Sequence, residues 1–315
     1  MSTKFSSRLL PLLAVSLMLL FTSASCKKKN DDMPQTGTIT MIVSNTPNFS
    51  ILKAAVIKAG LAATLDGKGP FTVFAPTNDA FKASGITLAT VNSLSAEALK
   101  EILLYHTVGA KVVAADVPAG PNANVATVGG KDIFLTKNSN GVFVNGVSVV
   151  AADIMATNGV IHAVSKVLMP PAGNIVEAAQ ANPNFSYLVA AVLRASQGGT
   201  NVAAVLSGNG PFTVFAPTNE AFKAAGFATI ADINNADPNT LTSILTYHVV
   251  SGRVFSSDLT NGAQPATVNG GKVTIGLTNG ATVKGNANTT PSKITATDMV
   301  TTNGIIHVID QVLLP

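Results

Sequence analysis

The feature that most constrains the fold of this chain is an internal duplication. Three segments recur in the same order about 140 residues further on, and a period this long indicates two globular domains, because solenoid repeats are much shorter. The ten-residue segment is repeated unchanged, and the last segment has one change. The pairs are Gly69–Asn78 with Gly210–Asn219, Tyr105-His106 with Tyr247-His248, and Asn158–His162 with Asn303–His307.

The chain divides most naturally at Pro170–Gly173, PPAG, between the two copies. We expect domain one to span residues 38–170 and domain two residues 172–315. A length of 315 residues agrees with this division, because a typical domain has about 100–200 residues and can bury its own core.

The first half of each copy predicts helices. Phe49, Leu52 and Val56 have helical spacing, and the strand-forming run Phe71–Phe74 is expected to stop at Ala75-Pro76. Side chains able to cap a helix precede further helical segments in both copies. These caps are Thr77 and Ser95 in copy one, and Thr218 and Asp237, the latter followed by Pro238, in copy two.

The second half of each copy predicts strands. Asn145-Gly146 between two apolar runs is a type I′ hairpin signal. A closing strand is expected over 160–168 in copy one and 305–314 in copy two. Helices early and strands late indicate an α+β module, present twice.

The N-terminus predicts export. Lys4 and Arg8 precede the apolar run Leu9–Phe21, and small residues follow it, which is typical of a secretory signal over residues 1–25. Ser23–Cys26 resembles the lipobox of bacterial lipoproteins, although Ser23 stands where leucine is usual. We therefore expect Cys26 to be lipidated and residues 26–37 to form a polar tether. The expected location is the cell envelope, at the outer membrane, on either its periplasmic or its surface face.

The basic charge of the chain lies mostly in this N-terminal segment. Of 20 Lys and Arg, five precede residue 33, along with two of 16 Asp and Glu, so the remainder is close to neutral. A nucleic-acid partner is not expected, because phosphate binding requires a basic surface.

The repeated motifs TVFAPTN, YH and NG(V/I)IH, with a terminal VLxP, resemble those of the fasciclin-type domain, here present twice. The resemblance covers nearly all of the chain after the tether. It implies a β-wedge with surrounding helices in each module, and a role in cell adhesion or matrix contact.

The resemblance also implies candidate ligand-binding positions. In copy one they are Leu104, Tyr105, His106 and the pair Asp153-Ile154. In copy two they are Tyr247, His248 and Asp298, although Met299 replaces the isoleucine. The tyrosines could equally pack in the core. His106 and His248 end apolar helical stripes, and His162 and His307 lie in closing strands, so core positions are expected for all four.

Patterns for catalysis or cofactor binding are absent from the sequence. It contains no Gly-x-Ser-x-Gly elbow, no His-Glu-x-x-His metal motif and no nucleotide-binding glycine motif. We expect no enzyme activity, no cofactor and no metal. Our first hypothesis is a lipid-anchored adhesion or matrix-interaction protein that binds extracellular or matrix proteins or glycans. The alternative is an envelope carrier or sensor of a small molecule, glycan or lipid.

Overall fold

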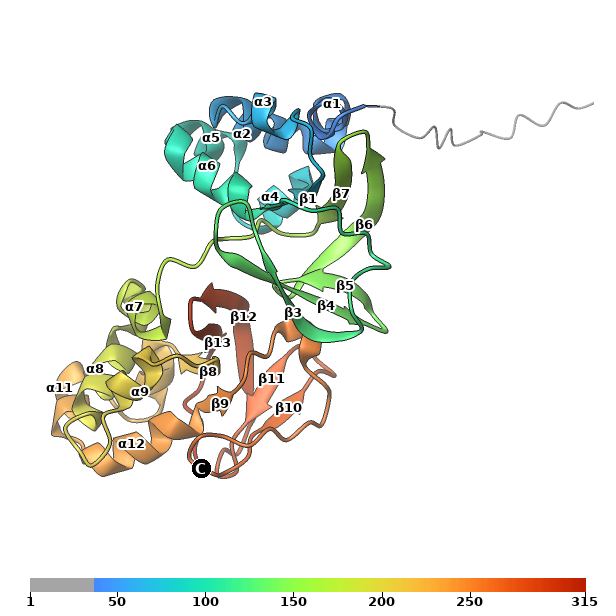
Figure 1. The fold of residues 1–315 in the computed structure, drawn as a ribbon. Helices are drawn as coiled ribbons and strands as arrows, with labels where there is room; N and C mark the ends of the chain where they lie inside the picture. Colours follow the sequence, from blue (N-terminus) through green and yellow to red (C-terminus); the bar gives the residue numbers. More distant parts are fainter. Residues whose placement is uncertain (1–36) are drawn as a thin grey trace, which may run out of the picture. The chain divides into compact units, whose positions relative to one another are not determined.

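The computed structural model describes residues 37–315 (Figure 1). The predicted signal segment, Cys26 and the predicted tether up to residue 36 lie outside the described residues. Two α+β modules follow one another, as the duplication predicted, each with its helices first and most of its strands after them. Within the described range, no helix combines the length and apolar character needed to cross a membrane.

Module one begins with helices that are interrupted by a single strand. Thr77 and Ser95 accept the backbone N–H groups of Ala80 and Ala98, which confirms both predicted caps. The first helix was not predicted, although Thr38 caps it in the same way. The elements are α1 (Ile39–Asn45), the 3-10 helix η1 (Pro47–Phe49), α2 (Ser50–Lys58), α3 (Ala62–Leu65), α4 (Asn78–Ala83), α5 (Leu88–Ser93) and α6 (Ala96–Tyr105).

Module two repeats this series. Thr218 and Asp237 cap α10 and α12, as predicted, and Pro238 occupies the first helical position of α12. The elements are α7 (Ile175–Gln180), η2 (Pro183–Phe185), α8 (Ser186–Ala195), α9 (Val202–Ser207), α10 (Asn219–Ala224), α11 (Ile230–Asn235), α12 (Pro238–Tyr247) and, later, η3 (Ser256–Asp258).

The strands of module one form one bent sheet in the order β2-β1-β7-β6-β5-β4-β3. The predicted hairpin is confirmed: Asn145 and Gly146, with φ of 49° and 75°, join β5 to β6. The strands are β1 (Phe71–Pro76), β2 (Thr107–Val108), β3 (Gly120–Ala126), β4 (Asp132–Asn138), β5 (Gly141–Val144), β6 (Val147–Ala156) and β7 (Gly159–Val164).

Module two has the corresponding sheet in the order β10-β11-β12-β13-β8-β9. Its strands are β8 (Phe212–Pro217), β9 (Val249–Ser251), β10 (Thr274–Gly276), β11 (Thr282–Lys284), β12 (Ser292–Thr301) and β13 (Gly304–Ile309). In each module one apolar core lies among the helices and a second lies within the strands.

Two strand predictions were wrong in length. The closing strands end at Val164 and Ile309, well before the predicted ends, because the backbone beyond the next residue bonds to side chains instead of to a neighbouring strand. In module one, for example, the Leu168 N–H donates to His106. The first strand of each module, in turn, continues through Ala-Pro to Pro76 or Pro217.

A parallel pair of strands closes each module. β1 pairs with β7 from Phe71↔Gly159 onward, and β8 pairs with β13 in the same register. A Cβ at Gly159 would collide with the Phe71 carbonyl, so only glycine permits this approach. The repeated Asn-Gly of the closing motif is therefore explained by backbone packing.

Buried asparagines connect these strands to the helices. The Asn158 side chain is 8% exposed and makes three hydrogen bonds. Its Oδ1 accepts the Ile39 N–H at 3.0 Å, and its Nδ2 donates to the carbonyls of Leu65 and Gly67, both at 2.8 Å. Asn303 makes the corresponding three bonds in module two.

We predict that Asn158→Ala destabilises module one by about 2–4 kcal/mol, because three buried backbone groups lose their partner. Urea unfolding followed by circular dichroism measures the change. Asn140→Ala, in an exposed turn, is the matched control and should leave the transition unchanged. Equal midpoints for the two variants would contradict the role given to Asn158.

Candidate functional site

The Tyr-His motif is the first candidate, and its tyrosine is buried. Tyr105 ends α6 and is 1% exposed. Its hydroxyl donates to the Asp132 carbonyl at 3.0 Å and accepts from Asn145 Nδ2 at 2.8 Å. Burial raises the pKa of Tyr105 to about 12. The side chain therefore joins α6 to the β5–β6 hairpin and offers no free polar atom to solvent.

His106, the next residue, is also buried. Its Nε2 accepts the Leu168 N–H at 2.9 Å, so its proton is on Nδ1, which donates to the Ile102 carbonyl at 2.8 Å. Burial lowers the pKa of His106 to about 4. The neutral ring thus joins the end of α6 to the segment after β7. Leu104, beside this pair, is half-buried and packs against the helical core.

Module two repeats this arrangement. The Tyr247 hydroxyl donates to the Lys272 carbonyl and accepts the Asn286 N–H. His248 bonds to the Ile244 carbonyl and accepts the Leu313 N–H, and burial lowers its pKa to about 4. The expectation that both histidines are core residues is confirmed.

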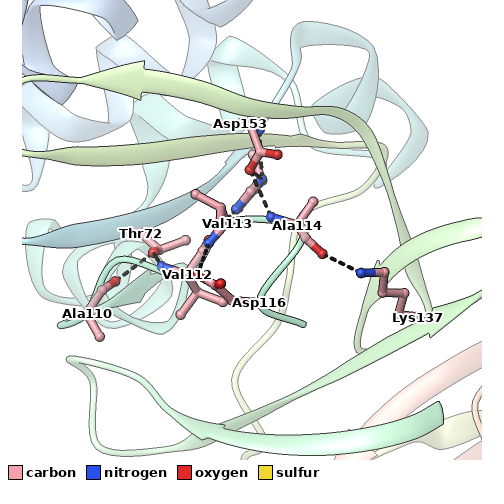
Figure 2. Close-up of polar contacts among 9 residues, drawn as sticks. Thr72, Ala110, Val112, Val113, Ala114, Asp116, Lys137 and Asp153 are labelled. Atoms are coloured by element: carbon pink, nitrogen blue, oxygen red, sulfur yellow. Dashed lines mark hydrogen bonds and ion pairs between the residues drawn. The ribbon is translucent and has the colours of Figure 1, made fainter. Parts of the chain in front are cut away.

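Asp153 is the second candidate and stands in a bulge of β6 with a positive φ of 58°. Figure 2 shows its carboxylate accepting the Ala114 N–H, at 2.9 Å. Its own N–H donates to Nδ1 of buried His162 at 3.2 Å, while Nε2 of that ring donates to the Val112 carbonyl at 2.8 Å. Asp153 and His162 therefore hold the 110–116 loop against the sheet. Ile154 packs against the helical core.

Asp298 takes the same position in β12, with φ of 64°. Its carboxylate accepts the Ser256 N–H at 2.7 Å and also bonds to the Ser256 hydroxyl. Its N–H donates to His307 Nδ1 at 3.3 Å, and His307 Nε2 donates to the Val254 carbonyl at 2.9 Å. Burial lowers the pKa of His307, although the charge of Asp298 opposes the shift.

These contacts limit the chemistry of the four histidines, all of which lie in the described part of the chain. Every ring nitrogen bonds to a backbone group, so none is free to take a proton from a substrate. His162 Nδ1 also lies 4.0 Å from the nearer Asp153 oxygen, beyond hydrogen-bond reach. Across residues 37–315, no group of three or more His, Cys, Asp or Glu side chains could hold a metal ion.

A groove of about 700 Å³ is lined by residues of both modules. Asp298 and Met299 of β12 belong to its lining, whereas Tyr105, His106 and Asp153 do not. Asn145, the partner of the Tyr105 hydroxyl, lies at the groove in the β5–β6 turn. The structure therefore does not bring the predicted residues into a single site.

Sequence reasoning missed the groove because its residues come from separate segments of both modules. The lining comprises the β5–β6 turn with residues 147–148, residues 165–170, residues near η2, and residues 297–300. The lining contains both polar and apolar side chains. The Asn145-Gly146 turn was recognised only as a hairpin signal.

Several contacts join the two modules beside this groove. Asn122 and Asn138 of module one donate to the carbonyls of Arg253 and Ser257, at 2.7 and 3.0 Å. The Arg253 guanidinium lies 4.0 Å from the centre of the Phe134 ring, a cation–π contact, and burial lowers the Arg253 pKa. These contacts hold the two modules together.

Comparison with known proteins gives consistent findings. The family model described as "Fasciclin domain" matches residues 47–170 and 183–315. Protein sll1483 of Synechocystis is 42% identical over 138 residues, which cover 42% of this chain and 74% of that protein. Human periostin is 30% identical over 255 residues, which cover 80% of this chain but only 29% of periostin.

A solved structure of a domain pair from the insect cell adhesion molecule fasciclin I aligns with a TM-score of 0.42. Its sequence identity is 19%, and the alignment covers 84% of this chain and 96% of that one.

The buried histidines predict a loss of stability in acid. His106 and His248 ordinarily titrate near pH 6.5 but have folded pKa values of about 4. As the pH falls below 6.5, the unfolded chain binds protons that the folded chain excludes. The free energy of unfolding should therefore decrease between pH 6.5 and about pH 4, by about 3 kcal/mol for each histidine. Below about pH 4 these two histidines should cause no further decrease.

Urea unfolding at a series of pH values from 7.5 to 4 tests this prediction. His106→Leu leaves the Leu168 N–H unpaired, so it should be less stable at pH 7.5 but lose less stability on acidification. An unfolding free energy that stays constant over this range would contradict the prediction.

Proposed function

Because the chain belongs to the fasciclin domain family, we propose that it is a lipid-anchored cell-envelope protein that binds extracellular or matrix proteins or glycans through the groove between its modules. Fasciclin domains occur in cell-adhesion and extracellular-matrix proteins. The observation that carries the proposal is the groove of about 700 Å³ lined by both modules. The role is binding rather than catalysis, because the histidines of each module are committed to backbone contacts.

The groove offers chemistry suited to an extended ligand. Met169 and Met299 are 55% and 36% exposed and supply adaptable apolar contacts. Asp298 and Lys166 add hydrogen-bonding groups of acidic and basic character. A few polar groups on an apolar lining fix the orientation of a bound chain.

The buried candidate residues support this surface indirectly. Tyr105 holds Asn145 through its hydroxyl, and His106 holds Leu168, so both position residues of the groove lining. Asp298 lies in the lining itself. In this proposal Tyr105 and His106 are positioning residues, and Tyr247 and His248 stabilise module two in the same way.

We predict that Met169→Lys combined with Met299→Lys weakens binding to a matrix protein or glycan ligand by about tenfold or more, because two apolar contacts are lost. Surface-binding assays with immobilised matrix proteins and a glycan array measure the effect. Leu88→Lys, equally exposed but outside the groove lining, is the matched control. Equal affinity for the double variant and the control would count against the groove, and no saturable binding by the unmodified chain would count against the function.

We predict that Cys26→Ala leaves the modules folded but releases the protein from membranes, because acyl chains on this thiol would supply the anchor. Membrane fractionation after signal cleavage, with circular dichroism of the soluble protein, measures both effects. A Cys26→Ala protein that still sediments with membranes would refute the lipid anchor. Protease accessibility on intact cells would separate a surface face from a periplasmic one.

A second candidate function, the carriage or sensing of a small molecule, is favoured by a separate cavity in module two. This cavity has about 330 Å³ and is lined mainly by apolar residues, among them Phe215, Val250 and Ile275. That volume is at the lower end of the range for small-molecule sites, about 300–1,000 Å³. Mass spectrometry of ligand co-purified with the chain distinguishes this function, since a matrix-binding protein needs no such ligand.

A further inference from the structure

Two exposed apolar side chains stand on the outer surface of the first helices of module one. Met41 on α1 is 52% exposed and Ile57 on α2 is 62% exposed. Both helices bury their other apolar residues against the helical core. Figure 1 shows α1, α2 and α3 at one end of module one, the end where the described chain begins.

The two helices form a continuous surface. Thr40 and Ser44 of α1 line one shallow crevice together with Lys53 and Ile57 of α2. The Thr40 hydroxyl also donates to the Ala62 carbonyl, at 3.1 Å, which connects α1 to α3. Met41 lies three residues before Ser44 on α1, and residues at this spacing are neighbours on a helix surface, so Met41 borders the same surface.

The charge of this surface is basic. Helices α1, α2 and α3 contain Lys53 and Lys58 and no acidic residue. Lys53 Nζ donates to the Ser44 carbonyl at 3.2 Å, and an ammonium has three donors, so two remain for another partner. The first acid in the described residues is Asp66, which follows α3 and bonds to the Thr38 hydroxyl.

The equivalent surface of module two differs in charge. The repeated Asn-Phe-Ser before α2 and α8 aligns Met41 with Glu177, Lys53 with Val189 and Ile57 with Leu193. Leu193 is 55% exposed, so an apolar residue is kept, but an acid replaces the methionine and a lysine is lost. Of the two equivalent surfaces, only that of module one has exposed apolar residues together with lysines and without an acid.

The short segment before α1 limits the distance between this surface and Cys26. Ten residues separate Cys26 from Gly37, and they can span at most about 40 Å. A lipid on Cys26 would therefore hold α1 close to a bilayer at a high effective concentration. Anionic headgroups attract lysines near the surface, and apolar side chains enter the boundary between headgroups and acyl chains.

We propose that the outer surface of α1 and α2, centred on Met41, Ile57 and Lys53, lies on an anionic lipid bilayer. The proposal rests on the lipid anchor of the proposed function. It orients module one with α1 and α2 towards the membrane.

The composition of the chain allows a direct test, because it has one cysteine and no tryptophan. The mature chain beginning at Cys26 is coupled through this thiol to a maleimide phospholipid in vesicles of phosphatidylglycerol and phosphatidylcholine. Ile57→Trp and the matched Leu193→Trp each introduce one fluorophore. Brominated phospholipid should quench the fluorescence of the Ile57→Trp chain about threefold more than that of the Leu193→Trp chain. The emission of the Ile57→Trp chain should also lie further to the blue, because its tryptophan enters less polar surroundings.

Two controls sharpen the result. Lys53→Glu in the Ile57→Trp chain, or vesicles of phosphatidylcholine alone, should reduce the quenching, because the electrostatic attraction is lost. Equal quenching of the two tryptophan chains would overturn the proposal. A blue shift of the Ile57→Trp chain that grows with protein concentration in the absence of vesicles would also overturn it, because a second copy would then cover the surface.

Chemical coupling supplies the anchor, so this result is independent of whether cells lipidate Cys26. Failure of the proposed anchor would appear separately, as an unmodified Cys26 or as membrane association that survives Cys26→Ala.

Discussion

The parallel pairing of an early strand with the last strand of each module is the contact on which the rest of the structure depends. β1 and β7 are about 90 residues apart in the chain, and parallel strands require a long crossover between them. Here that crossover contains most of the module, both its later helices and its other strands. Gly159 permits the close approach, and Asn158 fastens the start of β7 to α1 and to the loop after α3.

The four histidines perform a related task. Each ring donates to one backbone carbonyl and accepts one backbone N–H, and so connects two segments that are distant in the chain. An apolar residue would leave both groups unpaired in the core, at a cost of about 1–3 kcal/mol each. The tyrosines and histidines that the sequence offered as candidate binding residues are therefore mainly structural, and the proposed binding groove is formed from neighbouring segments that they hold in place.

Much of the local structure could be predicted from the sequence. The caps at Thr77, Ser95 and Asp237 were predicted correctly, as was the hairpin at Asn145, because each depends on residues within a few positions. The ends of β7 and β13 were not, because the backbone after them bonds to histidines about 60 residues away. The burial of Tyr105 was left open for a similar reason: its hydroxyl partners, Asp132 and Asn145, are distant in sequence.

The groove and the outer surface of α1 and α2 could not be recognised from short sequence motifs. The groove combines segments of both modules, and the basic apolar surface of α1 and α2 differs from its copy at only a few positions. By itself, the sequence determined the duplication, the α+β class, the family and the starts of α4, α6, α10 and α12, since these follow from repeated motifs and from short-range backbone chemistry. Only the tertiary structure decided that the two motif tyrosines are buried and which segments share a groove, because both depend on contacts between residues far apart in the chain.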